Sequence, residues 1–453
     1  MIKTDINLTP QALKSDLNHF WNLSAQKIYS IEKSFNNGQG SPVYTTKGQY
    51  VTKGWTEWTQ GFQYGSALLQ FDATDEQEFL EIGRKNTIER MAPHISHIGV
   101  HDHGFNNLST YGNLLRLMQE GRIENNKWEY DFYKLAIKIS GSVQAVRWTD
   151  ISNGNGYIYS FNGPHSLFVD TLRSCRILVL AHKLKHYLQG EGDIRISLLE
   201  RACKHILTTA HYSVFYGEGR DNYDEWGRTA HEIIFNINDG NYRCPNSQQG
   251  YSGFTTWTRG LAWAMVGFSE ELEAFATIPD EEFQSTGGRT TIISSMEKAA
   301  CAVCDFYIKN TPTDGIPYWD TGAPNLWKIG NYLQEPSNPY NSFEPIDSSA
   351  AAIGAQGLMR LGKYLNNDYY FKTGLTVLKA LLNEPYLSSN PNHQGLLLHS
   401  IYHRPNNWDY IPQNAQIPNG ESSMWGDYHI REAALYVTRL INNSTYYTFF
   451  NGY

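Results

Sequence analysis

Residues Val100–Gly121 read VHDHGFNNLSTYGNLLRLMQEG, a polar cluster followed by a periodic run. After Gly104, apolar residues recur every three or four positions, at Phe105, Leu108, Tyr111, Leu115 and Met118. This spacing predicts an amphipathic helix. The cluster therefore stands at a helix N-terminus, where unpaired backbone N–H groups and the positive end of the helix dipole stabilise a carboxylate such as Asp102.

Asp102 has two interpretations. A lone Asp before a helix most often caps it by accepting backbone N–H bonds. However, similar groups of polar, aromatic and charged residues precede other predicted helices of this chain. Capping alone does not require Trp, His or Arg beside the cap, so the repetition favours a functional cluster.

Helical periodicity recurs along the chain, whereas strand patterns are scarce. Twelve helices in six consecutive pairs are predicted over residues 9–34, 58–70, 75–91, 104–120, 129–145, 165–188, 194–210, 256–273, 290–309, 347–363, 366–382 and 422–440. Six helical hairpins close most economically into an all-α (α/α)6 barrel with its active site at one mouth. No clear linker interrupts the pattern, so residues 1–453 are predicted to form a single catalytic domain.

The second helix of each pair is predicted to be the inner one, because a helix buried on all sides is apolar or small throughout. Ser349–Leu361 (SAAAIGAQGLMRL) and Gly260–Phe268 (GLAWAMVGF) have this composition. Leu172–Ala181 (LRSCRILVLA) has it apart from its arginines. Since inner helices run parallel, their N-termini open at the same end of the barrel.

Polar and aromatic residues gather at those N-termini. The six clusters are Trp55–Phe62, His101–Phe105, Asn162–Asp170, Trp257–Gly260, Asp347–Ser349 and Glu421–Asp427. A ring of such clusters at one mouth describes a pocket. The non-helical segments Gly217–Thr255 and Thr311–Ile346 are too long for simple connections and are predicted to form its rim.

The composition excludes several classes of partner. Charged residues make up 18% of the 453 residues, the net charge is −8 and no long basic run occurs, which argues against nucleic acid and anionic membranes. No apolar run is long enough to span a membrane, and the N-terminus lacks the apolar core of a signal peptide. The expected location is the cytoplasm, or the periplasm if a signal has been removed. Aromatic residues reach 14%, as is typical of proteins that stack sugar rings.

The five cysteines have no framework spacing, so no disulfide scaffold is predicted. Cys301 and Cys304 form a CxxC pair inside a helical pattern, and no second pair accompanies it. A buried helical face explains this pair better than zinc or redox chemistry.

Two carboxylates on neighbouring inner helices, Asp102 and Asp170, carry the chemistry in this interpretation. Paired carboxylates catalyse sugar chemistry when their surroundings separate their pKa values, with one acid protonated and the other ionised. Asp170 also has a structural alternative, since it could cap its helix or pair with Arg173.

Four histidines surround Asp102, and imidazole and carboxylate are good ligands for zinc or iron. They are His94, His97, His101 and His103. His97 precedes a Gly and a bend, so the four are not expected to converge. We therefore predict no metal and no cofactor.

Arg259 lies four residues before Trp263, which would place a guanidinium and an indole on one helix face. Such a pair suits an anionic sugar, because Arg binds the carboxylate and the indole stacks on the ring. The alternative is an Arg that merely packs on aromatic surface.

Five motifs, in order, resemble those of the unsaturated glucuronyl hydrolases of glycoside hydrolase families 88 and 105, with family 88 the more similar. They are HDHGF, VDTL, QGYSGFTTWTRGLAWAMVGF, DGIPYWDTGAP…DSSAAAIGAQGL and ESSMWGDYHIREA. The resemblance runs from Trp55 to Leu440, most of the chain.

The resemblance implies an (α/α)6 barrel without a metal that removes a terminal Δ4,5-unsaturated uronic acid from oligosaccharides made by polysaccharide lyases. It also implies a mechanism in which an Asp protonates C4 of the vinyl ether and water adds at C5. By motif match the acid/base is Asp170 and its partner carboxylate is Asp102. The same match gives substrate-binding roles to Trp58, His101, His231, Gln249, Arg259 and Trp263.

Other functions remain open from the residues alone. The same Asp pair could hydrolyse saturated β-glucuronides, and in a barrel-type sugar isomerase His101 and His231 would carry the proton transfer instead. A non-catalytic sugar-binding barrel is the fourth possibility. The expected partner is an anionic oligosaccharide ending in a uronic acid, and the expected assembly is a monomer or homodimer.

Overall fold

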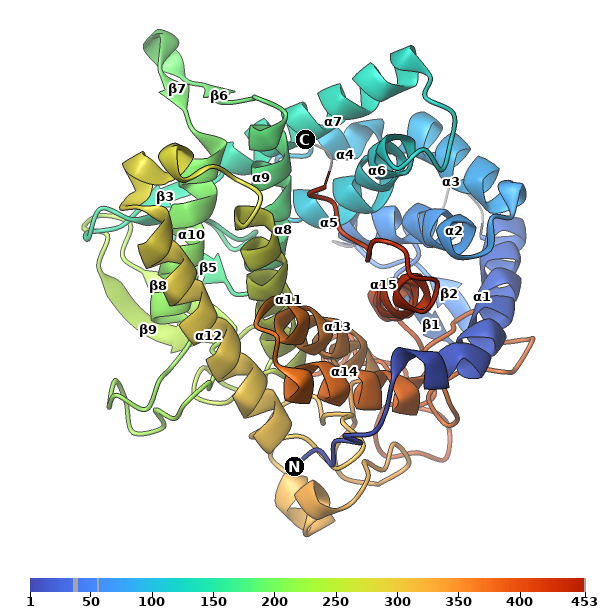
Figure 1. Ribbon diagram of the computed structural model, residues 1–453. Coiled ribbons are helices and arrows are strands. Elements are labelled where there is room, and N and C mark those ends of the chain that lie inside the picture. Colours follow the sequence, from blue (N-terminus) through green and yellow to red (C-terminus); the bar gives the residue numbers. More distant parts are fainter. Residues whose placement is uncertain (36–39, 55–56, 452–453) are drawn as a thin grey trace.

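The computed structural model describes residues 1–35, 40–54 and 57–451 as a double ring of helices (Figure 1). All twelve predicted helices are present, in the predicted order. The inner ring consists of α2 (Gln60–Thr74), α5 (His103–Asn107) continued by η3 (Leu108–Gly112) and α6 (Asn113–Gln119), α8 (Thr171–Ser174) with α9 (Arg176–Lys183), α11 (Thr258–Phe275), α13 (Ser348–Tyr364) and α15 (Met424–Ile441). The outer ring consists of α1 (Lys14–Ser34), α3 (Gln77–Arg90), α7 (Lys127–Val146), α10 (Leu198–Tyr212), α12 (Arg289–Lys309) and α14 (Asp368–Leu381).

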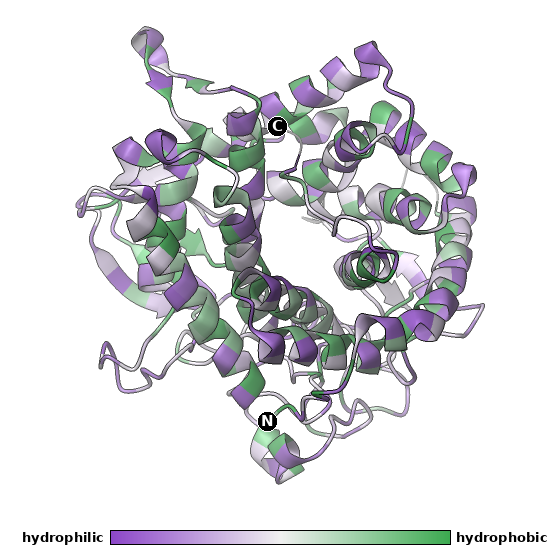
Figure 2. Cartoon of the chain, viewed as in Figure 1, coloured by the Kyte–Doolittle hydropathy of each residue, from purple (hydrophilic) through white to green (hydrophobic). Residues whose placement is uncertain are grey.

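The inner helices close on one another as an (α/α)6 barrel requires. Around the ring, α2 packs on α5 and η3, α5 on α8, α8 on α11, α11 on α13, α13 on α15, and α15 returns to α2. Every residue of α11 is buried, as the apolar composition of its sequence predicts. In Figure 2 hydrophobic residues line the interior helices, while hydrophilic residues gather on the outer rim. The all-α barrel prediction is therefore confirmed.

Short antiparallel strands decorate the loops and do not form a layer of their own. They are β1 (Tyr44–Thr46), β2 (Gln49–Val51), β3 (Trp148–Asp150), β4 (Gly156–Ile158), β5 (Ser166–Phe168), β6 (Leu188–Gln189), β7 (Arg195–Ile196), β8 (Glu232–Phe235) and β9 (Tyr242–Asn246). The largest sheet has the order β5-β8-β9, with Phe168 opposite Glu232. None of the helices in the described ranges is long and apolar enough to cross a membrane.

One helix prediction was wrong in extent. Residues 165–188 were expected to form one helix, but Ser166–Phe168 form β5, which pairs with β8 and is buried. The helical part runs only from Thr171 to Lys183, and Lys185 takes a left-handed backbone conformation that ends it. Local periodicity could not reveal β5, because its partner strand lies more than sixty residues further along the chain.

The arginines of this segment, which did not fit an inner helix, are explained by buried ion pairs across the ring. Arg173 pairs with Glu270 on α11 at 2.8 Å and with Glu432 on α15 at 2.6 Å. Arg176 also reaches Glu270, at 3.0 Å. On α13, Arg360 pairs with Glu273 at 2.6 Å. These contacts join four inner helices, and they occupy Arg173, so it is not the partner of Asp170.

Gly104 allows α5 and α8 to approach closely. A Cβ added there would lie 2.2 Å from the carbonyl oxygen of Ser174, a distance that no side chain tolerates. The Oγ of Ser174 accepts the Gly104 N–H at 2.9 Å and donates to the carbonyl of His101 at 2.7 Å. The glycine of the HDHGF motif is therefore a packing requirement.

We expect Gly104→Ala to lower the free energy of unfolding by about 1–3 kcal/mol, because the added methyl overpacks the α5–α8 contact. A Gly-to-Ala change inside a helix normally stabilises by about 1 kcal/mol, so the sign of the effect is diagnostic. Urea unfolding followed by circular dichroism measures it. Gly354→Ala serves as the control, since its Cβ would meet only side-chain atoms, the Tyr307 ring at 3.2 Å and the end of Met265 at 3.5 Å. An equal or smaller loss for Gly104→Ala would contradict the packing argument.

Candidate active site

A cavity of about 830 Å³ opens where the N-termini of the inner helices meet. Four of the six predicted clusters contribute to its lining, through Trp58, the His101–Phe105 segment, the Asn162–Asp170 segment and the Trp257–Arg259 segment. The other two clusters have structural roles. Asp347 caps α13 and pairs with Arg259, while Asp427 accepts the backbone N–H groups of Leu396 and Leu397. Trp55, at the start of the first cluster, lies outside the described residues.

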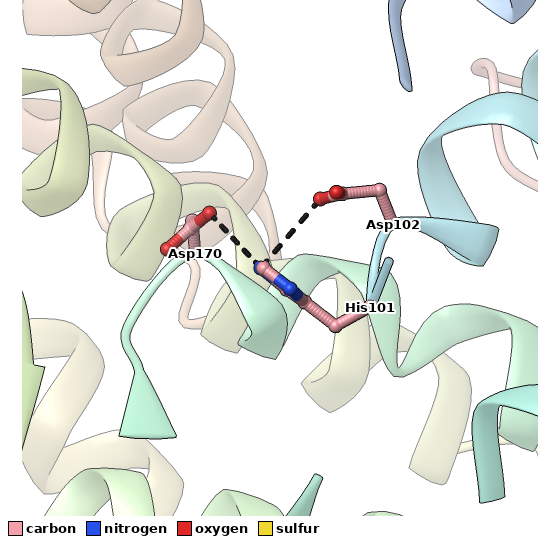
Figure 3. Close-up of side chains that lie close together, drawn as sticks. All are labelled: His101, Asp102 and Asp170. Atoms are coloured by element: carbon pink, nitrogen blue, oxygen red, sulfur yellow. Dashed lines mark ion pairs between the residues drawn. The ribbon is translucent and has the colours of Figure 1, made fainter. Parts of the chain in front are cut away.

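His101 joins the two predicted catalytic carboxylates, as Figure 3 shows. Its Nε2 lies 3.7 Å from Oδ1 of Asp102 and 3.6 Å from Oδ2 of Asp170. Asp102 precedes α5 and Asp170 precedes α8, and neither makes a side-chain capping bond. The capping alternative is therefore wrong for both residues. His101, Asp102 and Asp170 are each more than nine-tenths buried, so their charges interact with little screening by water.

Burial and mutual attraction set the protonation of these three groups. Burial alone would lower the pKa of His101, but Asp102 and Asp170 raise it above its ordinary value. Burial raises the pKa of Asp102, and the neighbouring Asp170 adds to this. Burial would also raise the pKa of Asp170, yet contact with His101 brings it below its ordinary value. Before substrate binds, Asp102 is therefore the carboxyl group that retains a proton more readily.

His231 approaches the other carboxylate oxygen of Asp170, with its Nε2 3.8 Å from Oδ1. Its Nδ1 accepts the backbone N–H groups of Gln248 and Gln249 at 3.1 and 3.3 Å. An accepting Nδ1 carries no proton, so in the neutral ring Nε2 carries it and faces Asp170. Burial lowers the pKa of His231 to about 4, which keeps this tautomer neutral near pH 7.

Arg259 holds the cavity wall together through both of its terminal nitrogens. Nη1 contacts Asp347 at 3.1 Å and donates to the carbonyl of Ile401. Nη2 donates to Oε1 of Gln249 at 3.0 Å and to the carbonyl of Tyr402 at 2.7 Å. These bonds occupy the terminal N–H groups expected for a bidentate grip on a sugar carboxylate. The structure thus favours a role in orienting Gln249.

Arg259 and Trp263 both line the cavity, as their position on one helix face predicts, but each packs on other rings. The Arg259 guanidinium lies over the rings of Trp257 and Trp425, at 4.7 and 4.8 Å from their centroids. Trp263 instead packs edge-on against His429 and contacts Phe105 at 4.9 Å. Helix periodicity placed the two side chains near each other but could not show which aromatic ring each one meets.

Trp58 lies in the cavity wall as predicted. Its ring stacks on Trp425 at 5.2 Å with an angle of 26° between the planes. An indole supported from behind in this way presents a flat apolar face, which suits stacking of a sugar ring.

The chain also resembles known proteins over nearly its whole length. No protein-family model matches it. An unsaturated glucuronyl hydrolase of Formosa agariphila is 25% identical over 382 residues, which cover 83% of this chain and 79% of the relative. A second one, of a Bacillus sp. (strain GL1), is 24% identical over 413 residues, which cover 88% and 90%. This chain is a homologue of the unsaturated glucuronyl hydrolases.

The fold comparison agrees with the sequence comparison. The crystal structure of an unsaturated glucuronyl hydrolase specific for heparin superposes with a TM-score of 0.70 at 19% identity, covering 95% of this chain and 100% of that one. The resemblance predicted from the five motifs is confirmed.

Part of the cavity wall escaped the sequence analysis. Tyr402, His403, Asn406 and Trp408 line the cavity from a loop between α14 and α15. The signal was a non-helical segment of nearly forty residues containing an aromatic and polar group, YHRPNNWD, before the last inner helix. This loop adds the aromatic rings of Tyr402 and Trp408 to the cavity lining.

The histidines around Asp102 do not converge on a metal. His103 is buried against Ser140 and the carbonyl of His97, and His94 contacts Gln60 and Asn106. In the described ranges, the group with ligand-like spacing is His101, Asp102 and Asp170, whose nearest ligand atoms lie within 4.8 Å of one another. The raised pKa of His101 opposes cation binding there, because a protonated imidazole cannot ligate. That no metal takes part stays a prediction.

We expect Asp102→Asn and Asp170→Asn each to lower the pKa of His101, because each removes a negative charge within 4 Å of its Nε2. Histidine side-chain NMR across a pH titration measures this directly. His399 is the internal reference, since burial lowers its pKa to about 4 and neither Asp102 nor Asp170 is among the groups that shift this pKa. A His101 pKa that neither substitution moves would contradict the proposed coupling.

Proposed function

We propose that this protein removes the terminal Δ4,5-unsaturated uronic acid from lyase-generated oligosaccharides. The observation that carries the proposal is the buried Asp102–His101–Asp170 group at the mouth of an (α/α)6 barrel. The homology to unsaturated glucuronyl hydrolases supports the same substrate class.

The reaction is a hydration of the double bond between C4 and C5. A carboxylic acid donates a proton to C4, and water adds its hydroxide to C5 while its remaining proton returns to the carboxylate. The resulting hemiketal opens by breaking the bond between C5 and the ring oxygen. The hemiacetal left at C1 then expels the aglycone as an alcohol. One water is consumed, and no group on the protein is oxidised, reduced or covalently modified.

Asp170 is the proposed proton donor, with Asp102 as its partner. In the free site, contact with His101 holds the pKa of Asp170 below its ordinary value, whereas burial raises the pKa of Asp102 and makes it the more readily protonated of the two. A bound uronate brings a further carboxylate, and added negative charge raises the pKa of nearby carboxyl groups. We therefore propose that the bound uronate raises the pKa of Asp170, so that this carboxylate takes up a proton from water before transferring it to C4. His231 orients Asp170 through its Nε2–H.

Gln249 lines the cavity and its side-chain amide can donate a hydrogen bond to the substrate carboxylate, while Trp58 stacks on the sugar. His231 is not among the cavity-lining residues, and its one N–H faces Asp170. Arg259 acts at one remove, by orienting Gln249 and the backbone at residues 401–402. Trp263 lines the same cavity and packs on Phe105.

Hydrolysis of a saturated glucuronide by an inverting mechanism is less consistent with the geometry. An inverting glycosidase keeps its two carboxyl groups about 6.5–9.5 Å apart to admit a water. Here the nearest ligand oxygens of Asp102 and Asp170 lie within 4.8 Å of each other, and His101 contacts both. The named relatives likewise act on unsaturated glucuronyl groups according to their names.

We expect loss of the ultraviolet absorbance of the conjugated double bond when the protein is mixed with Δ4,5-unsaturated disaccharides from several lyases. Asp170→Asn should lower this rate about 10²–10⁴-fold, the usual contribution of general acid catalysis. Asp193→Asn is a matched control, since Asp193 is an exposed residue at the end of a short 3-10 helix and does not line the cavity. Comparing substrates in the same assay ranks the aglycones.

Two results would overturn the proposal. One is release of glucuronate from saturated glucuronides with no change in absorbance, which would indicate a β-glucuronidase. The other is full activity of Asp170→Asn with loss of activity in His101→Ala and His231→Ala, which would indicate an isomerase. Inactivation by a chelator, restored by a divalent cation, would instead show that the three-residue group binds a metal.

Arg259→Lys tests the orienting role. A lysine keeps the charge but cannot hold Gln249, Asp347 and two carbonyls at once. We expect kcat/KM to fall about tenfold through a higher KM, equivalent to the loss of one positioned hydrogen bond. Steady-state kinetics on the preferred disaccharide measures it, and an unchanged KM would contradict this role.

A further inference from the structure

Helix α7 carries a hydrophobic face that no other described segment covers. Among the exposed large hydrophobic residues of the described ranges, five lie in α-helices, and four of these are on α7. They are Trp128, Leu135, Ile139 and Val146, with exposed fractions of 67%, 55%, 39% and 61%. The other outer helices contribute only Tyr369. This concentration on one helix distinguishes the face from scattered surface hydrophobics.

The face is separate from the one that α7 buries in the barrel. Its inward residues include Tyr133, Ala136 and Ile137, which are buried against the inner ring. The four exposed residues are spaced seven, four and seven positions apart. The half-buried Phe132 lies between Trp128 and Leu135 on the same face, and its ring stacks on that of Trp128 with the centroids 5.3 Å apart. This is the a/d spacing of a helix–helix seam. We define the α7 stripe as Trp128, Phe132, Leu135, Ile139 and Val146.

Helix α7, which carries the stripe, lies on the rim of the ring in Figure 1, and Figure 2 shows both hydrophobic and hydrophilic residues along it. Beside the stripe, α7 carries a negative charge at Asp131 and a positive charge at Lys138, seven residues further along. Asp131 pairs with Lys127 at 2.6 Å, but both side chains are more than half exposed. Such an exposed pair contributes little and leaves Asp131 accessible to a second partner.

We propose that α7 is a homodimer interface, in which the stripe packs antiparallel on the same stripe of a second copy. In the register where Phe132 faces Leu135 of the second copy, Trp128 faces Ile139, and the two-fold axis repeats both contacts. The same register places Asp131 beside Lys138 of the second copy, again twice. In this single register the apolar residues of the stripe face one another and the flanking charges meet charges of opposite sign. The same surface therefore complements itself, as an isologous interface requires.

The inference is independent of the catalytic proposal, because no α7 residue lines the cavity. Helix α7 has 20 residues and is about 30 Å long, which gives a smaller contact than a standard interface. The dimer is therefore expected to be weak and dependent on concentration.

Analytical ultracentrifugation of the full chain over a micromolar concentration series tests the proposal. The wild type should reach twice the 51.7 kDa mass of one chain. Leu135→Glu should raise the dimer Kd at least about tenfold, because it would place a charge in the apolar seam. Circular dichroism and thermal unfolding establish that each variant is folded.

Charge reversal tests the register. Asp131→Lys and Lys138→Glu should each weaken the dimer by bringing like charges together, and the double variant should restore it. Lys134→Glu is the matched control: it makes the same charge change one turn away, off the seam, and should leave the dimer intact. A wild type that stays monomeric throughout, a dimer that Leu135→Glu does not weaken, or a double variant without recovery would each overturn the proposal.

Discussion

The buried contacts of Arg173 with Glu270 and Glu432 are the interaction on which the barrel depends most. Arg173 is fully buried, and it links α8 to α11 and α15 through the middle of the ring. Burial would raise the pKa of both glutamates, but the surrounding arginines bring it below the ordinary value, so both remain charged. Replacing only one partner of such a pair leaves an uncompensated buried charge, which costs about 3–5 kcal/mol. The network therefore fixes which inner helices adjoin.

This constraint reaches the active site through α8. Arg173 anchors α8 from within the ring. This fixes the position of Asp170, which directly precedes α8 and lines the cavity. Ser174, one residue after Arg173, binds both His101 and Gly104 and so brings the loop carrying Asp102 to the same level. The catalytic geometry is thus determined by packing contacts of a single short helix. These contacts hold two buried carboxylates around one imidazole.

The sequence predicted the twelve helices, the inner and outer sets and the position of the carboxylates, since each depends on local periodicity or on a helix N-terminus. It failed where long-range pairing decides. Strand β5 needs β8 to exist, and the partners of Arg259 come from the loop at residues 401–402 and from Asp347, nearly ninety residues away or more. A guanidinium has five N–H donors and can form hydrogen bonds with many different sets of acceptors, and the spacing of residues along one helix does not predict which acceptors it meets.

The loop that the sequence analysis missed shows how a wall without regular secondary structure can still be rigid. Arg259 binds the carbonyl oxygens at residues 401 and 402, and the Asp409 carboxylate accepts the N–H groups of Tyr402 and His403 at 2.5 and 3.0 Å. The carbonyl oxygens and the N–H groups of this backbone therefore bond to the charged side chains of Arg259 and Asp409, which replace the hydrogen bonds that a neighbouring strand would supply. The side chains of His403 and Trp408 are consequently held in the cavity lining. Variation of this loop can reshape the aglycone side while Asp102, His101 and Asp170 stay in place, because the loop and the carboxylates are anchored on different inner helices.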